Sequence, residues 1–171
     1  MFIKYIKEIS LKKILKRSLH NVKPSLLTTP ILTVGLVIDE SYFSDKEQLT
    51  KELVACGVKE SNIKMIVFRD KKKNETFSQP TFSNNDMSWK GTLSPIFVKD
   101  FINIPFDMLI SYYDTEKAPL LLITNHSKAL FKVGFSTVDK RLNHLMINTN
   151  AENYKVFVHE LFRYLKILNK I

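Results

Sequence analysis

Acidic residues follow the most hydrophobic segments of the chain, where predicted strands end. Asp39 and Glu40 follow ILTVGLVI, Asp70 follows NIKMIVFR, and Asp114 follows DMLISYY. In open parallel sheets, ligands bind outside the carboxyl ends of the strands, near the reversal of strand order. If the first of these strands is central, Asp39 and Asp114 could lie near each other and hold Mg²⁺. Both are therefore candidates for a catalytic or phosphoacceptor site.

The same acids have a structural interpretation, because carboxylates at strand ends also cap the following helices or face water. A receiver-like phosphoacceptor site also needs a hydroxyl and a lysine after later strands, and Thr124 and Lys132 do not fall at predicted strand ends. Neither G-x-G-x-x-G nor G-x-x-x-x-G-K-[ST] occurs, and the four glycines are scattered. We therefore expect no nucleotide cofactor.

Histidine and cysteine do not predict a metal site. The four histidines are not at metal-pair spacing, and the single cysteine, Cys56, leaves no cluster for zinc and no internal disulfide. His126, in TNHSKA, is a candidate general acid because histidine titrates near neutrality, although a solvated or helix-capping role is the simpler interpretation. One cysteine fits a reducing cytoplasm, which is the predicted location.

Positive charge is concentrated at the start of the chain. The net charge is +9, and residues 1–23 carry +6 of it, since seven lysines and arginines there face Glu8 alone. Such a block favours an anionic partner, either RNA or the ribosome or another anionic surface, although a solvated helix face is the alternative. The candidate contact residues are Lys4, Lys7, Lys12, Lys13, Lys16 and Arg17.

Residues 2–20 are predicted to be helical, with their apolar side chains in two sets. Phe2, Tyr5, Ile6 and Ile9 fall on one side. The second set, on nearly the opposite side, is Leu11, Ile14, Leu15 and Leu19. This favours two short helices, or one helix that contacts two surfaces. A membrane-surface helix needs one continuous apolar face, so a membrane partner is less favoured. Lysines interrupt every apolar run, which argues against a secretory signal, and no run reaches the roughly 20 residues of a transmembrane helix.

The rest of the chain reads as one α/β domain, residues 31–171, preceded by the basic helical extension, residues 1–23. Buried-type strands at 31–39 and 62–70 flank an amphipathic helix, and further strands are expected at 107–114, 130–136 and 144–149. A short helix is expected after Pro119, and a final helix opening on the capping box of Thr149 and Glu152. The prediction is a three-layer, Rossmann-like α/β fold with a mostly parallel sheet of about five strands and helices on both faces.

Residues 71–100 lack a strong helical period and contain the only tryptophan, in NNDMSWKGTLSP. We expect extended edge structure at 76–82 or 88–93 and a short helix at 95–101. Trp89 and the phenylalanines nearby, among lysines, could stack on single-stranded RNA. The favoured interpretation is structural: Trp89 covers a face of the sheet where a helix is missing.

Three segments, MSWKG, FDMLISYYD and SKALFKVGF, occur in an order and spacing that resemble an uncharacterised family of small proteins from Bacteroidetes bacteria. The resemblance implies a basic N-terminal helix, a short α/β domain and a bacterial cytoplasmic setting. It implies no mechanism, because that family has no assigned activity. The predicted function is a non-enzymatic binding module whose basic N-terminal helix contacts RNA, the ribosome or another anionic surface. The alternative is an enzyme or phosphoacceptor-like domain that uses the acids at the strand ends.

Overall fold

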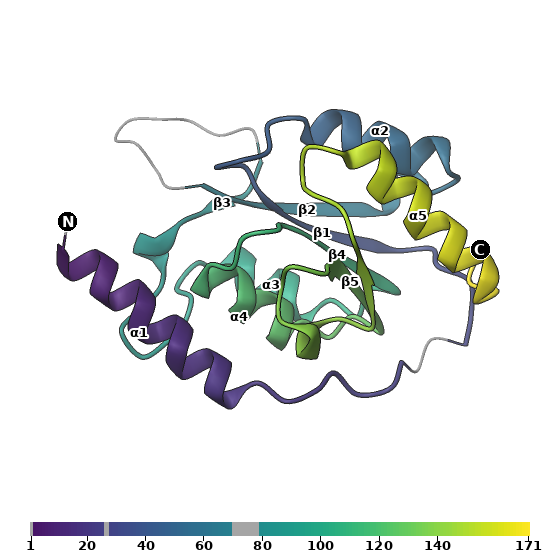
Figure 1. Ribbon diagram of the computed structural model, residues 1–171. Helices are drawn as coiled ribbons and strands as arrows, with labels where there is room; N and C mark the ends of the chain where they lie inside the picture. The colour runs from purple at the N-terminus through teal and green to yellow at the C-terminus, as the bar shows by residue number, and fades with distance from the viewer. Residues whose placement is uncertain (1, 26–27, 70–78) are drawn as a thin grey trace.

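The computed structural model describes residues 2–25, 28–69 and 79–171, and the side chains from residue 5 onward within these ranges. Six parallel strands form one sheet in the order β3-β2-β1-β4-β5-β6 (Figure 1). The predicted α/β fold is confirmed, with one strand more than expected. The strands are β1 (Val34–Asp39), β2 (Ile63–Phe68), β3 (Thr81–Phe82), β4 (Met108–Tyr112), β5 (Phe131–Phe135) and β6 (Leu145–Ile147).

The central strands are buried along their whole length. Every residue of β1, β4 and β5 is buried, which is why these segments read as continuous apolar runs. The chain moves outward from β1 to β2 and β3, then returns to β4 on the other side of β1 and moves outward again. The strand order therefore reverses between β1 and β4, and this is where open α/β sheets usually bind ligands.

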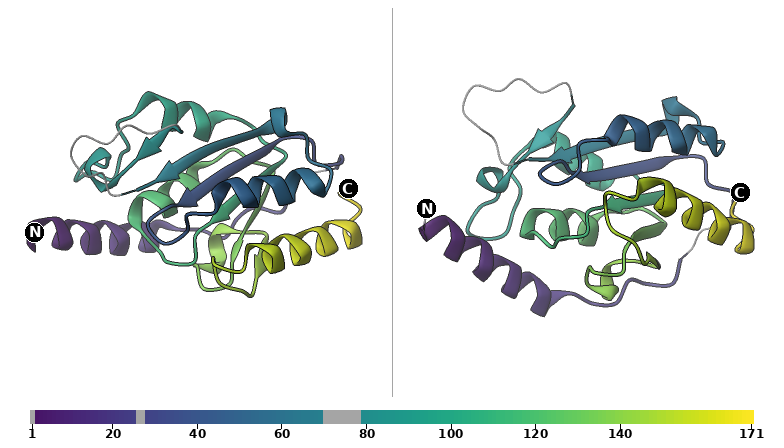
Figure 2. Two further views of the ribbon diagram at one scale, coloured as in Figure 1. Left: turned by 90° about the horizontal axis from the view of Figure 1, so that it is seen from above. Right: turned by 45° about the horizontal axis from the view of Figure 1, so that its top comes forward.

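Helices cover both faces of the sheet, as predicted (Figures 1 and 2). Helices α2 (Lys46–Ala55) and α5 (Tyr154–Ile167) pack together on one face, and α3 (Ile96–Asn103) and α4 (Ala118–His126) lie on the other. The predicted start of the final helix is wrong, because α5 begins after Asn153. The Asp114 carboxylate accepts a hydrogen bond from the Ala151 N–H and holds the segment before α5 in a turn.

The N-terminal segment forms one helix, α1 (Phe2–Ser18), rather than two short ones. Leu11, Leu15 and Leu19 form a stripe of buried side chains, and α1 packs against α4. Tyr5, Ile6 and Ile9, which belong to the other apolar set, are exposed. Helix α1 thus packs on the domain through the face that carries these leucines. No helix in the described residues is long and apolar enough to cross a membrane.

The segment with the tryptophan is ordered over residues 79–95. Part of the expected edge structure is confirmed as β3, while residues 76–78 lie outside the described residues. A bridge joins Met87 to Leu93, and the turn between them ends at Gly91, whose φ of +74° lies in the region that favours glycine. The expected short helix is α3.

The predicted structural plug is wrong, because the Trp89 side chain is 61% exposed. The buried hydrophobic side chains of this segment are instead Phe82, Met87 and Leu93, which belong to the core. The edge strand β3 brings Phe82 against Phe68 of β2, with ring centroids 5.5 Å apart. The sheet therefore extends sideways here instead of being covered by Trp89.

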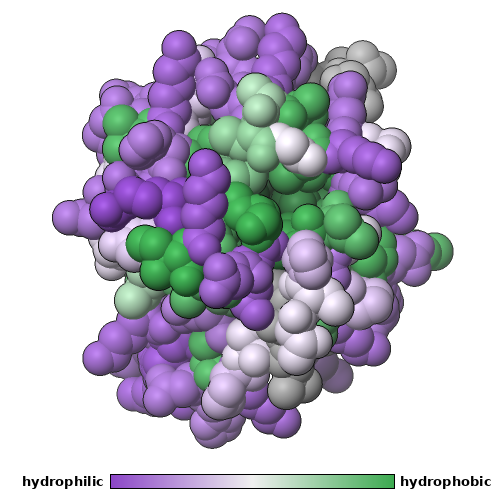
Figure 3. Space-filling model, turned by 90° about the vertical axis from the view of Figure 1, so that its right-hand side faces the viewer, coloured by the Kyte–Doolittle hydropathy of each residue, from purple (hydrophilic) through white to green (hydrophobic). Residues whose placement is uncertain are grey.

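The amino edge of the sheet carries exposed hydrophobic side chains among hydrophilic ones (Figure 3). The approach to β1 and the end of the chain meet here, because the Ile31 N–H donates to the Lys170 carbonyl at 2.8 Å. The exposed apolar residues on these two segments are Leu32, Ile167, Leu168 and Ile171.

Candidate functional sites at the carboxyl edge and on helix α1

A buried ion pair occupies the point where the strand order reverses. Asp39 ends β1 and is 3% exposed, and its Oδ2 lies 2.7 Å from the Lys117 Nζ. The Asp39 Oδ1 accepts a hydrogen bond from the Ser41 N–H at 3.0 Å. The Lys117 ammonium lies 4.6 Å from the ring centroids of both Tyr42 and Phe68. Charge and aromatic contacts thus hold Lys117 against Asp39.

Glu40 is also engaged within the protein. Its carboxylate pairs with Lys46 at the start of α2, and the other oxygen lies 3.1 Å from the Arg69 Nη2. The two carboxylates at the end of β1 therefore form ion pairs with side chains from the neighbouring segments. Asp70 lies outside the described residues.

Asp114 fixes two loops beside β4. Its Oδ2 accepts the Ala151 N–H at 2.9 Å, and its backbone carbonyl accepts the Thr137 hydroxyl at 2.8 Å. Strands β1 and β4 are neighbours, as the sequence argument required, but Asp39 and Asp114 have separate partners. Among the described residues, no group of three His, Cys, Asp or Glu side chains could hold a metal ion.

The remaining enzymatic candidates lie away from this edge. His126 is exposed at the last residue of α4. Thr124 is buried, and its hydroxyl bonds the hydroxyls of Ser111 and Tyr113 at 2.9 and 2.7 Å. A catalytic or phosphoacceptor role for Asp39, Asp114 or His126 stays a prediction.

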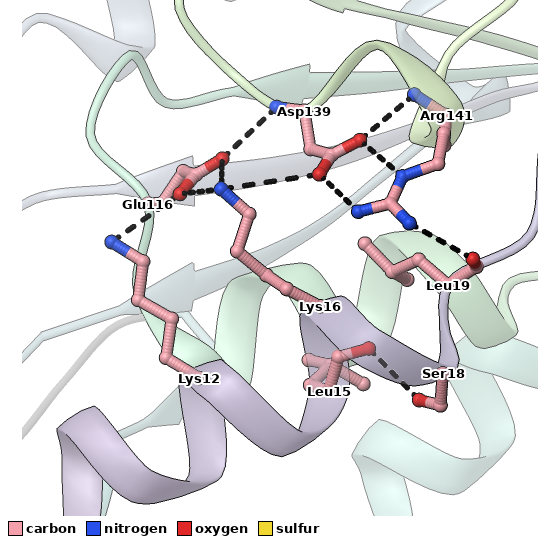
Figure 4. Close-up of polar contacts among 8 residues, drawn as sticks. All are labelled: Lys12, Leu15, Lys16, Ser18, Leu19, Glu116, Asp139 and Arg141. Carbon is pink, nitrogen blue, oxygen red and sulfur yellow. Dashed lines mark hydrogen bonds and ion pairs between the residues drawn. The ribbon is translucent and has the colours of Figure 1, made fainter.

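Two lysines of α1 neutralise acids of the domain (Figure 4). The Lys12 and Lys16 ammonium groups lie 3.3 and 2.8 Å from the Glu116 Oε2, and Lys16 is 3.9 Å from Asp139. Burial raises the pKa of Glu116, but hydrogen bonds from Lys16 and Lys12 outweigh it and hold that pKa below its ordinary value. These two lysines therefore fasten α1 to the loops after β4 and β5.

Arg141 completes this network from the loop after β5 (Figure 4). Its guanidinium forms two bonds to Asp139, of 2.9 and 2.6 Å, and a third to the Leu19 carbonyl at 3.1 Å. The hydrogen bond from Arg141 lowers the pKa of Asp139 to about 2.

The opposite flank of α1 meets the tryptophan loop. Lys7 donates to the Met87 carbonyl, and its Nζ lies 5.5 Å from the Trp89 ring centroid. Lys13 and Arg17 are exposed on the side of α1 away from the buried leucines. The side chain of Lys4 is outside the described part of the chain. The structure thus places Trp89 beside the basic helix, a contact that no local pattern could indicate across some 80 residues of sequence.

His144 and Lys132 form a cluster that sequence reasoning missed. A backbone N–H can only donate, so the His144 Nδ1 accepts from the Lys132 N–H at 2.8 Å, and the protonated Nε2 donates to the Lys23 carbonyl at 2.8 Å. Burial lowers the pKa of His144, which favours this neutral ring. The only sequence signal was a lysine inside an otherwise apolar strand.

Residues 7–168, from α1 to the end of α5, match a family of unknown function (DUF6913). The chain belongs to this family. No curated protein and no solved structure matches the chain. The resemblance to an uncharacterised family is therefore confirmed, while the bacterial origin stays a prediction. The family match spans both α1 and the α/β domain, which agrees with their close packing.

Proposed function

We propose that the protein is a non-enzymatic binding module that contacts single-stranded RNA, free or on the ribosome, through α1 and the loop that carries Trp89. One observation supports this above the others. The Lys7 contact brings an exposed aromatic ring onto the surface of the basic helix. Stacking on an aromatic ring, combined with lysine and arginine contacts to phosphates, is how proteins bind single strands without sequence preference.

The outer face of α1 supplies the phosphate contacts. Lys12 and Lys16 both pair with Glu116, so their ammonium groups are held against the domain and are less available to a ligand. Lys13 and Arg17 are exposed, and neither has an ion-pair partner within the described part of the chain. Lys90 adds an exposed cation next to Trp89.

The test is the affinity for a fluorescent single-stranded RNA of mixed sequence, measured by anisotropy over a range of salt concentrations. Each phosphate contact contributes about 0.7 to the slope of log affinity against log salt. The double variant Lys13→Glu/Arg17→Glu should bind weakly and with a flatter slope. Trp89→Ala should bind about 5- to 100-fold more weakly with an unchanged slope, because stacking is not ionic.

The matched control is Lys51→Glu/Lys155→Glu, which makes the same change in net charge with exposed residues of α2 and α5, on the other face of the sheet. RNA affinity in this control should fall much less than in the α1 double variant. An equal fall in both variants, or no RNA binding by the wild type at low salt, would overturn the proposal.

A further inference from the structure

A cavity of about 380 Å³ lies where the linker after α1 passes the end of α4 and the start of β5. A volume of this size is within the range of small-molecule sites. The linker contributes one wall, and the His144 bond to the Lys23 carbonyl holds that wall in place. The lining residues on the opposite side follow α4, from Asn125 to Leu130, and continue into β5.

The lining is basic. Four lysines and arginines and two histidines line the cavity, and none of its described lining residues is an aspartate or glutamate. Arg141 is neutralised by Asp139. The ammonium groups of Lys23 and Lys128 have no ion-pair or hydrogen-bond partner in the described ranges, and both side chains are exposed. The cavity therefore carries uncompensated positive charge.

Lys132 provides the buried part of this charge. It is 6% exposed, and its ammonium donates to the Thr124 and Asn125 carbonyls at 2.7 and 3.2 Å. An ammonium has three N–H donors, so two carbonyls leave one unused. The carbonyl dipoles at the end of α4 compensate the charge only in part, since burial lowers the pKa of Lys132 to about 8. A bound anion would supply the missing compensation.

The other lining residues suit a ligand with an organic part. Val22, Pro24, Leu130 and Leu142 contribute apolar surface beside the lysines. A bare inorganic ion would leave this surface in water, whereas an organic group would cover it. A phosphate monoester carries nearly two negative charges at neutral pH and three acceptor oxygens, which matches a site with several lysines better than a single carboxylate does.

We propose that this cavity binds a small phosphate monoester, with the phosphate held by Lys23, Lys128 and Lys132 and the organic part against the linker. The site is separate from the RNA surface proposed above, which uses the outer face of α1 and Trp89. It requires no chemistry on the ligand.

Isothermal titration calorimetry with ribose 5-phosphate as the probe tests the proposal in a phosphate-free buffer, with ribose as the uncharged control. Wild-type protein should bind ribose 5-phosphate saturably and should not bind ribose. Lys128→Ala should weaken binding about tenfold, because a charge-assisted contact is lost. Lys132→Met, which keeps the length of the buried side chain, should weaken it further.

The matched control is Lys140→Ala, which removes one exposed lysine outside the cavity lining and should leave the affinity unchanged. Lys23→Ala and Lys128→Ala change exposed side chains, so they test the site even if Lys132→Met does not fold. The proposal is overturned if the wild type shows no saturable binding at millimolar ribose 5-phosphate. It is also overturned if Lys128→Ala and Lys23→Ala bind as tightly as Lys140→Ala.

Discussion

Asp39 and Lys117 form a buried ion pair at the carboxyl end of β1. Both side chains are almost fully buried, so each charge depends on the other. Removing one partner of a buried pair leaves an uncompensated charge, which costs about 3–5 kcal/mol, whereas removing both is often nearly neutral. We expect Lys117→Met to lower the free energy of unfolding by about that amount, and Asp39→Asn/Lys117→Met to recover most of it.

Urea unfolding of the two variants and the wild type measures these differences. The exposed lysine of α5, in Lys155→Met, is the control and should change stability by less than about 0.5 kcal/mol. If Lys117→Met is as stable as this control, the ion pair contributes little to the stability of the fold. A functional role for Asp39 and Lys117 would then be the better explanation of the pair.

Asp139 makes the free energy of unfolding depend on pH in the acid range. Its pKa is lowered from 3.8 to about 2, so the folded state binds a proton less readily than the unfolded chain. The stabilisation is fully present above the ordinary pKa and is lost as pH falls toward the folded value. We expect Arg141→Gln to raise the pKa of Asp139 toward its ordinary value and to flatten the loss of stability between about pH 5 and pH 2.

Carbon-detected NMR titration of the Asp139 carboxyl group and unfolding at several pH values provide the two readouts. Arg163→Gln is the control, because Arg163 pairs with Glu160 on the exposed side of α5 and should not affect Asp139. An unchanged pKa of Asp139 in Arg141→Gln would mean that Lys16 or the backbone, and not the guanidinium, holds the carboxylate in its charged form.

Helix α1 is held by one stripe of leucines. Leu15 is 8% exposed, whereas Ile14, the residue before it, is 62% exposed. We expect Leu15→Ala to lower the free energy of unfolding by about 2–3 kcal/mol and Ile14→Ala to change it by less than about 0.5 kcal/mol. Equal effects in urea unfolding would contradict the packing of α1 on α4. Deleting residues 1–23 would uncover buried residues of α4, so charge reversal on α1 is the cleaner functional test.

The His144 ring that holds the linker after α1 accepts a bond from β5 only when it is neutral. Protonation would remove the acceptor at Nδ1 and break the bond from the Lys132 N–H. Because the folded-state pKa is lowered, stability is present above the ordinary pKa of 6.5 and falls as pH drops through it. We expect the hydrogen-exchange protection of the Lys132 amide to fall between about pH 7.5 and 5.5.

This fall in protection should be absent in His144→Gln and present in His159→Gln, which changes an exposed histidine on α5. The same pH dependence in both variants would assign the effect to another group. The intrinsic exchange rate also changes with pH, so protection factors, rather than raw rates, are compared.

At the scale of the whole molecule, most of the sheet was predictable because its strands are buried on both faces and read as apolar runs. The two-residue strand β3 was predicted only loosely, as part of extended edge structure at 76–82 or 88–93, since a short edge strand carries almost no period. The environment of Trp89 was mispredicted for a different reason. Trp89 lies beside Lys7 of α1 and not over a face of the sheet, and contacts between distant segments leave no local signal.

In the candidate sites, too, positions with a local sequence signal were predictable and contacts between distant segments were not. The sequence placed Asp39 and Asp114 correctly at the carboxyl ends of β1 and β4, because the apolar runs end there. It could not show that Lys117 pairs with Asp39, or that Lys12 and Lys16 pair with Glu116. The loops determine which charged side chains come together, and the conformation of loops is the least regular part of the chain.

The division into a basic extension, residues 1–23, and an α/β domain, residues 31–171, stays a prediction, and unfolding measurements test whether the two are separate units. The buried leucines and the ion pairs with Glu116 and Asp139 join α1 to the domain along one side. We therefore expect α1 and the domain to unfold as one unit. Trp89 is the only tryptophan and lies against Lys7, so its fluorescence reports on α1, while far-ultraviolet circular dichroism reports on the whole chain.

Coincident urea transitions by the two probes are the expected result, because different probes agree only when no intermediate is populated. Leu15→Ala should shift both transitions together to lower urea. A fluorescence transition at clearly lower urea than the circular dichroism transition would show that α1 detaches first. In that case the extension is a separate unit, and the apolar residues that α1 covers on α4 become available to a partner.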